Sequence, residues 1–573
     1  MPHADTPLGA AKNGLTFFEK LQLPSGPWGC EYGGPLFLLP GVVITWYITK
    51  TPIPSAYATE IKNYIEARAD PEDGGWGLHI ESGSTLFGTS LNYTALRLVG
   101  VDPDDPLMVK ARGTLHKLGG AVNSPHWAKF WLAVLGVMDW DIVNPVPPEF
   151  WLLPDWAPFA PWRWWIHIRQ VFLPMGYLYS KRWSCEETDI TRGLKEELFV
   201  QPYAEINWAS HRNSIAAVDN RNPKTWVLNS ANWFLVNIWN PYLRPNFVKE
   251  WAESWVSQLV DMEDANTDYL DLAAVSAPMN TLVCYVRDGP DAFSVKRHIE
   301  RLEEFLWMKN EGLLCNGTNG VQCWDTAFLT QAVFDSGLEH DERWRPMLLK
   351  ALNYLDRQQI RDNCKDQEKC YRQPRKGGWP FSTKSQGYAV SDCVSEALKA
   401  VILLQKAGGF PQVLEDQRIF DAVDTLLLFQ NDNGAVSSYE TRRGGDYMEN
   451  INAAEVFASS SVMVEYDYPE CTASCVTALS LFNKHWPDYR TKEVKMFIKR
   501  ATNWIKTNQK IDGAWYGSWG ICFTYATMFA LEGMASIGET FTNSKTSKRG
   551  CEFLVSKQRE DGGWSESYKV RVN

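Results

Sequence analysis

The sequence has no run of eighteen uninterrupted apolar residues, although hydrophobic residues make up 45% of the chain. Its most apolar stretch, Gly33 to Ile48, is broken by Pro35 and Pro40. Because a helix that crosses a membrane needs roughly 20 apolar residues, we expect no spanning helix. Attachment to one face of a membrane remains open, since an interfacial element inserts only its apolar side.

The sequence also has no block of Lys or Arg, and its formal net charge is -11. We therefore expect no nucleic-acid partner. The first residues do not combine a charged start with an apolar core, so no signal peptide is expected. The twelve cysteines form no CxxC pair, and we interpret them as reduced thiols of an intracellular protein with no metal site.

Aromatic residues are abundant, with 27 Trp, 22 Tyr and 26 Phe. Tryptophan supplies a broad apolar surface and a π face that attracts cations. The excess fits either repeat-stacking side chains in a large helical core or a cavity that holds a cation or a large hydrocarbon. Both interpretations can hold at different positions.

A short pattern recurs along the chain: an apolar helix end, Gln, a turn, then Gly and Trp. A Gln amide at such a place can bond backbone groups of a neighbouring helix end, and a Gly-rich turn closes the helix. Recurrence of such units predicts stacked helix hairpins, and strand signals are sparse. The sequence thus predicts an all-α protein of helix pairs closed into α/α barrels, and 573 residues favour two domains. Complete copies are Gln22 with Trp28, Gln509 with Trp515 and Gln558 with Trp564; incomplete copies lie at Trp76, Gln430 and Trp379, the last keeping only Gly and Trp.

A proline-rich segment, Asn144 to Trp162, interrupts the helical pattern with aromatic residues. It is interpreted either as a buried plug between subdomains or as an apolar patch for membrane contact.

The stretch "AVSDCVSEAL" puts Asp392 beside Cys393 in an apolar run, with Glu396 one helical turn later. No basic residue of the stretch could neutralise these carboxylates. A buried aspartate usually caps a helix or bonds backbone groups, but a catalytic acid also suits such surroundings.

Several longer motifs carry a family resemblance: "YGGPLFLLPG" from Tyr32, "DGGWGLHIE" from Asp73, "GTNGVQCWDTAF" from Gly317, "VSDCVSE" from Val390 and "GSWGICFTYAT" from Gly517. Together with the Gln–Trp repeats, these motifs make the chain resemble oxidosqualene cyclases of the lanosterol synthase type, and in particular those of fungi. The resemblance runs from about residue 13 to Tyr568. It implies two α/α barrels, for which we expect an N-terminal domain over 14–290 and a catalytic domain over 291–573.

The resemblance implies cyclisation of (3S)-2,3-oxidosqualene to a tetracyclic triterpene, lanosterol by default, with no metal and no cofactor. It also implies monotopic attachment to the endoplasmic reticulum membrane or to lipid droplets. Protostadienol or another fungal skeleton is the alternative product.

By the same resemblance, Asp392 is the general acid that protonates the epoxide. Such an acid must be neutral before reaction, and an apolar environment keeps it so. Cys393 and Cys471 match the thiols that hydrogen-bond this acid, and Glu396 matches the carboxylate that relays a proton back. The related squalene–hopene cyclases instead carry a DxDD motif.

The remaining family positions concern the carbocation that forms after the epoxide opens. Aromatic faces stabilise a cation without trapping it, although core packing is the commoner role of a Trp. His167 and Tyr439 match a terminating base pair, whereas a lone His among aromatics is more often structural. Tyr32 matches a residue that shapes the substrate fold. The matching aromatics are Trp324, Phe381, Trp519 and Trp165.

The match departs from the family pattern at both ends: the usual N-terminal lead-in is shortened, and family members continue after Tyr568 through further helices. We therefore expect a truncated chain whose second barrel lacks its last helices, which makes an inactive remnant a rival hypothesis. An α/α-barrel glycosidase is disfavoured, because Asp392 and Glu396 lie one helical turn apart and do not straddle a glycosidic bond. A prenyltransferase subunit would need zinc ligands, and none is evident.

Overall fold

A computed structural model describes residues 3–457, 462–518 and 522–566. The chain divides into two compact units. Unit 1 comprises Met1–Cys30, Gly320–Arg442 and Glu465–Asn573, and unit 2 comprises Glu31–Asn319 and Arg443–Val464. Helices dominate both units, which confirms the predicted fold class, and the named strands of the described residues form one hairpin.

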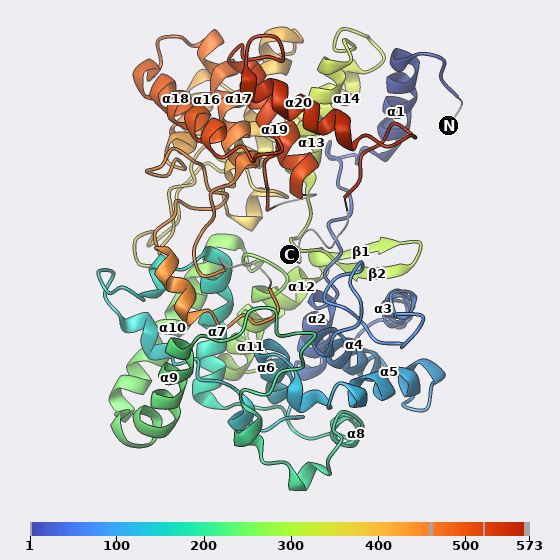
Figure 1. Cartoon of the computed structure of the whole chain (residues 1–573), viewed down its shortest axis with the longest axis vertical. Coiled ribbons are helices and arrows are strands. Elements are labelled where there is room, and N and C mark those ends of the chain that lie inside the picture. Colours follow the sequence, from blue (N-terminus) through green and yellow to red (C-terminus); the bar gives the residue numbers. More distant parts are fainter. Residues whose placement is uncertain (1–2, 458–461, 519–521, 567–573) are drawn as a thin grey trace. The chain divides into compact units, whose positions relative to one another are not determined.

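Unit 1 is built from alternating inner and outer helices (Figure 1). The inner helices α13, α15, α17 and α19 pack against one another in that order. Helix α15 is buried along its whole length, whereas the outer helices bury one face each, as expected for an inner and an outer layer. The bounds are α1 (Pro7–Leu21), α13 (Gln322–Asp335), α14 (Arg345–Gln358), α15 (Ser391–Ile402), α16 (Asp416–Leu427), α17 (Pro469–His485), α18 (Thr491–Thr507), α19 (Cys522–Ser536) and α20 (Lys545–Lys557).

Unit 2 has the same helical character, with α2 packed on α4 and α11, and α7 packed on α10 and α11. The hairpin of β1 and β2 is antiparallel, pairs Leu306 with Cys315, and packs on α3. The bounds are α2 (Leu38–Ile48), α3 (Ser55–Ala67), α4 (Leu86–Leu98), α5 (Pro106–Lys117), α6 (His126–Val134), α7 (Ile166–Lys181), α8 (Asp189–Glu197), α9 (Trp226–Phe234), α10 (Asn246–Thr267), α11 (Ser276–Asp288), α12 (Phe293–Leu302), β1 (Leu306–Lys309) and β2 (Gly312–Cys315).

The expected linear division near residue 290 differs from this partition. Helix α1 belongs to unit 1, where Figure 1 shows it near α14. Gln22 Nε2 donates to Met347 O of α14 at 2.9 Å, and Trp28 N donates to Thr326 Oγ1 of α13 at 3.3 Å. The first residues therefore pack with the C-terminal half of the chain, because their repeat needs an outer helix as its partner.

The Gln–Trp repeat is a hydrogen-bonded turn between consecutive helices. Gln509 Nε2 bonds Gly513 O at 2.8 Å within its turn and Thr546 O of α20 at 2.9 Å. Trp515 Nε1 bonds Ile505 O at 2.7 Å, at the end of α18. Gly513 has a φ of +97°, and a Cβ there would lie 2.4 Å from Arg549 O, so glycine is required.

The copy at Trp379 is more complete than the sequence suggested. Trp379 Nε1 bonds Leu355 O at 2.8 Å, as in other copies. The role of Gln is taken by Gln359, whose Nε2 bonds Gly377 O and Arg418 O at 2.8 and 2.9 Å. An inserted loop between Gln359 and Gly377 hides this copy in the sequence, since the pattern assumes a fixed spacing.

The proline-rich segment 144–162 has both buried and exposed tryptophans. Trp151 is buried in unit 2, whereas Trp156 is 80% exposed. Neither interpretation of the segment therefore describes all of it. Among the described residues, no helix is both long enough and apolar enough to cross a membrane.

Candidate active site

Asp392 lies in the first turn of α15, where the surrounding chain fixes its position. The helix begins against a loop of unit 1, because Ser391 N donates to Ser438 O at 2.8 Å and Ser391 Oγ donates to Ser437 O at 2.7 Å. Asp392 is 3% exposed, and its Oδ1 accepts the backbone N–H of Cys393 at 2.9 Å. The carboxyl group is thus held by a tight contact with its own helix.

A thiol from the neighbouring inner helix completes the contacts of this carboxyl group. Cys471 Sγ on α17 donates to Asp392 Oδ2 at 3.5 Å. Burial raises the pKa of the Cys471 and Cys393 thiols well above their usual value, so both keep their protons at neutral pH. The structure therefore brings together Asp392, Cys393 and Cys471, which are 79 residues apart at their extremes (471 minus 392).

Burial raises the pKa of Asp392 from 3.8 to about 7. The hydrogen bonds from Cys393 and Cys471 oppose this rise, and the carboxylates of Glu470 and Glu396 add to it. A carboxyl group with this pKa holds its proton in about half of the molecules at neutral pH. The site can therefore present a neutral carboxylic acid.

Glu396 has a basic partner, which corrects the expectation from the sequence. Lys399 Nζ lies 2.7 Å from Glu396 Oε2, and Gln331 Nε2 donates to the same oxygen at 2.8 Å. Both members of the ion pair are buried. Lys399 stands just beyond the stretch "AVSDCVSEAL", three residues after Glu396, where helical geometry brings the two side chains together. Asp392 makes no ion pair among the described residues, so only one of the two carboxylates is neutralised by a cation.

Two further residues of the centre were missed in the sequence. Glu470, next to Cys471, is 1% exposed and accepts Ser518 N at 3.0 Å. Tyr525 on α19 has a pKa raised well above 10 by burial and by Asp392, Glu470 and Cys471. Its hydroxyl group therefore remains a proton donor. The motif "PECTASC" contained the signal for Glu470, a carboxylate directly before the matched cysteine.

A series of aromatic rings extends through unit 1 to Tyr525. Trp324 lies 5.5 Å from Phe381 and 4.6 Å from Phe328, measured between ring centroids. Phe328 lies 6.2 Å from Phe529, which lies 4.9 Å from Tyr525. Helices α13 and α19 supply most of these rings. Two of the predicted cation-stabilising residues, Trp324 and Phe381, thus belong to one connected aromatic surface that reaches the neighbourhood of Asp392.

The other predicted site residues are distributed over both units. In unit 2, the Trp165 ring lies 4.4 Å from that of His167 in a tilted arrangement, and Tyr32 N donates to Asn316 Oδ1 at 2.9 Å. Tyr439 belongs to unit 1, where its ring lies 6.0 Å from that of Tyr388.

Burial lowers the pKa of His167 to about 3, and Arg169 adds to the effect. The imidazole is therefore neutral at physiological pH. Trp519 lies outside the described residues.

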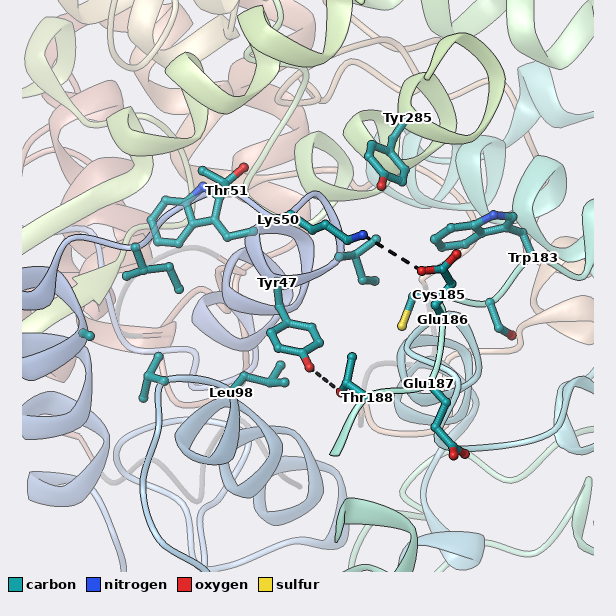
Figure 2. Close-up of a pocket in the computed structure, with 16 residues that line it drawn as sticks. Tyr47, Lys50, Thr51, Leu98, Trp183, Cys185, Glu186, Glu187, Thr188 and Tyr285 are labelled. Carbon is teal, nitrogen blue, oxygen red and sulfur yellow. Dashed lines mark hydrogen bonds and ion pairs between the residues drawn. The ribbon is translucent and has the colours of Figure 1, made fainter. Parts of the chain in front are cut away.

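Figure 2 shows a pocket in unit 2. Its volume is about 760 Å³. Lys50 Nζ faces Glu186 Oε2 across it at 4.0 Å, and Tyr47 Oη lies 2.5 Å from Thr188 Oγ1. Its lining includes none of the predicted site residues. This cavity is therefore separate from the acid centre of unit 1.

Two family models match the chain. The squalene-hopene cyclase N-terminal domain matches residues 15–311, and the squalene-hopene cyclase C-terminal domain matches residues 321–572. The chain therefore belongs to the squalene-hopene cyclase family, a family of terpene cyclases with two α/α barrel domains.

Curated relatives narrow the comparison. The lanosterol synthase of Gibberella zeae is 72% identical over 97% of this chain and 72% of its own length. A lanosterol synthase of Aspergillus fumigatus is 66% identical over 95% of this chain and 76% of its own. The human lanosterol synthase is 43% identical over 99% of this chain and 78% of its own. The resemblance to cyclases of the lanosterol synthase type is thereby confirmed.

The matches also bear on two subsidiary expectations. The matches run over nearly the whole of this chain, and they do not bear out the expectation of a truncated chain. They span about three quarters of the relatives' own length. The rival hypothesis of an inactive remnant is not supported either, since relatives of high identity are named as enzymes.

Proposed function

We propose that this protein cyclises (3S)-2,3-oxidosqualene to lanosterol. The observation that carries the proposal is the buried carboxyl group of Asp392, with a pKa of about 7 and hydrogen bonds from Cys393 N and Cys471 Sγ. Relatives up to 72% identical are named lanosterol synthases. An acid that is neutral at rest and stabilised after losing its proton is what epoxide opening requires.

In the proposed first step, Asp392 transfers its proton to the epoxide oxygen, and the carbon–oxygen bond breaks as the neighbouring alkene electrons form the first ring bond. The Asp392 carboxylate left behind accepts hydrogen bonds from the Cys471 thiol and from the amide N–H of Cys393. Both hydrogen bonds favour the charged form. Product control then depends on how the cation is guided.

The aromatic series would guide the cation, because ring faces carry negative charge density but no nucleophilic lone pair that traps a carbocation. Trp324, Phe328 and Phe381 form a continuous surface in unit 1. Each desolvated ring face contributes on the order of 2 kcal/mol to a nearby cation. The remaining aromatic candidates, Trp165 and Tyr32, contribute in unit 2 by this proposal.

Removal of the final proton needs a neutral base. His167 fits, because burial lowers its pKa to about 3 and leaves the imidazole uncharged. Tyr439 is the second residue that we assign to this step. Regeneration of Asp392 is assigned to Glu396, whose carboxylate is oriented by Lys399 and Gln331.

Expression in a yeast without lanosterol synthase tests this function. We expect lanosterol in the extracted triterpenes by mass spectrometry, and none from an Asp392→Asn variant of equal abundance. A protostadienol-type spectrum would keep the cyclase chemistry and replace the product. Accumulated oxidosqualene with folded protein present would overturn the function.

We further propose that the protein docks on one face of the endoplasmic reticulum membrane or a lipid droplet through an aromatic segment, Trp226–Trp251, of unit 2. This segment comprises α9, the π-helical stretch η7 (Leu235–Leu243) and the start of α10, neighbouring elements in Figure 1. Tryptophan, tyrosine and phenylalanine suit a membrane interface. The exposed fractions are 79% for Trp226, 61% for Trp233, 81% for Tyr242, 71% for Phe247 and 62% for Trp251.

Flotation with phosphatidylcholine vesicles tests the docking. Replacing Trp233, Phe247 and Trp251 by Ser should leave most of the protein unbound. Trp156→Ser is the matched control, because Trp156 is 80% exposed but lies outside the segment. Equal flotation of the triple variant and the control would refute the assignment.

A further inference from the structure

A second buried cluster of reactive side chains lies in unit 2, outside the proposed catalytic machinery. Asp264 near the end of α10, Cys284 on α11 and His298 on α12 converge, and Asp271 follows in the loop after α10. All four side chains are buried, with exposed fractions of 0–2%. Nothing in the proposed cyclisation uses them.

The spacing of three of these groups matches a metal coordination shell. One ligand atom each from Asp264, Cys284 and His298 lies within 4.8 Å of the others. His298 Nε2 is 3.2 Å from Asp264 Oδ2, and Cys284 Sγ is 3.5 Å from the same oxygen. Ligands around tetrahedral zinc, at roughly 2.0 Å for N or O and 2.3 Å for S, stand roughly 3.3–3.6 Å apart.

The other nitrogen of the imidazole ring has the neighbour that a metal-bound histidine needs. His298 Nδ1 lies 3.7 Å from Asp271 Oδ2. Metal-binding histidines almost always donate their second N–H to a carboxylate or carbonyl, which fixes the ring orientation. Asp271 has a φ of +53°, a backbone conformation that residues other than glycine adopt uncommonly.

Two side chains of the cluster, those of His298 and Asp271, lack hydrogen bonds of good geometry within the described part of the chain, whereas Asp264 accepts hydrogen bonds from Cys284 Sγ and Asn280 Nδ2, each at 3.5 Å. Neither ring nitrogen of His298 and neither carboxylate oxygen of Asp271 has a hydrogen bond of good geometry among the described residues. Buried polar atoms of this kind cost free energy unless something satisfies them. Arg287 reaches Cys284 Sγ at 4.0 Å, and its guanidinium group is engaged by Asp261 and Asp288 at 2.8 and 2.6 Å.

We propose that Asp264, Cys284 and His298 bind a zinc ion, with Asp271 holding the imidazole of His298. One thiolate, one imidazole and one carboxylate form a ligand set that suits zinc and disfavours magnesium or calcium. The ion would join α10, α11 and α12, so its role is to stabilise unit 2. No sequence motif marks this site, because its ligands are 20 and 14 residues apart (264 to 284, 284 to 298).

The alternative is that protons balance the cluster. Without a metal, burial raises the pKa of Asp264 to about 8 and that of Asp271 well above its usual value. Two neutral carboxylic acids could then share the site with a neutral imidazole. The two explanations differ in whether a metal copurifies with the chain and whether its removal changes stability.

Metal analysis of the purified full-length chain tests the proposal. We expect about one zinc per chain, and a loss of more than tenfold in bound zinc for Cys284→Ser and for His298→Gln. Cys315→Ser is the matched control, since Cys315 is a buried thiol of unit 2 outside the cluster. Co²⁺ added to metal-free chain should give visible absorption typical of tetrahedral thiolate ligation in the control but not in the two variants.

The unfolding temperature of the unmodified chain tests the zinc site even if the variants fail to fold. A chelator added to the unmodified chain should lower its unfolding temperature by about 4 °C or more, and zinc should restore it. Less than 0.1 zinc per folded chain after zinc addition, with no change in unfolding temperature, would overturn the proposal in favour of protonated carboxyl groups.

Discussion

Two buried clusters of carboxyl groups and thiols, one in each unit, differ in what neutralises them. In unit 1, Asp392 is held by Cys393 N and Cys471 Sγ and pairs with no cation in the part of the chain that the structure describes, while its neighbour Glu396 is paired with Lys399. In unit 2, Asp264 and Cys284 converge on an imidazole. The same residue types thus produce an acid in one unit and a set of metal ligands in the other.

The comparison shows that burial alone does not assign a function. Burial raises the pKa of the aspartate in both clusters. What separates them is the neighbour: thiols that remain protonated stabilise a carboxylate only weakly, so Asp392 can lose and regain a proton. In unit 2, the His298 imidazole and the Cys284 thiol both lie next to Asp264 Oδ2, an arrangement that favours binding of a metal cation instead.

The largest expected effect concerns the acid itself. Asp392→Asn removes the transferable proton, and we expect turnover of oxidosqualene to fall by about 10³-fold or more. Asp219→Asn is the control, because Asp219 is also buried, has a pKa raised to about 6, and serves to bond Leu86 N and Phe87 N at 2.8 and 3.2 Å. Turnover measured on detergent-solubilised protein checks both. Equal losses would mean that burial of any carboxyl group matters and that Asp392 has no special role.

The second effect concerns the ion pair that distinguishes Glu396 from Asp392. Lys399→Met leaves a charged carboxylate buried without its cation, and we expect a loss of about 3–5 kcal/mol in unfolding free energy. Urea unfolding followed by tryptophan fluorescence measures it. Adding Glu396→Gln should recover most of the loss. Failure of this double variant to recover would show that Lys399 acts through packing.

The third effect is a dependence of stability on pH. The folded-state pKa of Asp392, about 7, lies above the value of about 3.9 for an unfolded aspartate. Its contribution to stability is therefore fully present below about pH 4 and is lost as pH rises through 7. Relative to the parent chain, Asp392→Asn should gain on the order of 3 kcal/mol between pH 4 and pH 8.

Thermal unfolding of the two chains at several pH values measures this difference. Asp416→Asn, at a half-buried position in the first turn of α16, serves as the control for the substitution itself. A constant difference between the parent and Asp392→Asn would mean that the carboxyl group titrates normally.

The smallest effect concerns the thiol. Cys471→Ala removes a hydrogen bond that favours the carboxylate form of Asp392, so the pKa of Asp392 should rise above about 7. We expect turnover to fall about tenfold, with the alkaline limb of the pH–rate profile moved to higher pH. Cys475→Ala, a buried thiol one turn further along α17, should leave that limb in place. An unmoved limb in Cys471→Ala would separate the thiol from the acid.

The sequence predicted the fold through features that are local in the chain. The recurring Gln–Gly–Trp turn and the helical periodicity indicated stacked helix pairs, and the structure shows these turns as hydrogen-bonded links. The copy around Gln359 and Trp379 escaped notice because an insertion separates its two ends. The placement of α1 in unit 1 also escaped, since nothing local says which outer helix accepts Gln22.

The acid motif was visible for the same reason, as Asp392, Cys393 and Glu396 occupy one short stretch. Cys471 was assigned only through the family resemblance, and the structure brings it to Asp392. Lys399, the basic partner of Glu396, lies one helical turn after it but outside the stretch that contains the motif. Glu470 is marked in the sequence only by its place directly before Cys471, and Tyr525 has no motif that marks it, because its relation to Asp392 arises from helix packing.

The sequence by itself determined the class of fold and singled out Asp392 as the candidate proton donor, because both depend on residues within a few helical turns of each other. Only the tertiary structure decided which buried groups are neutral, which are paired, and which converge on a candidate ion. Those properties depend on the distances between side chains from different helices. The pKa of a carboxyl group depends on every group packed around it, and those groups come from parts of the chain that are far apart in sequence.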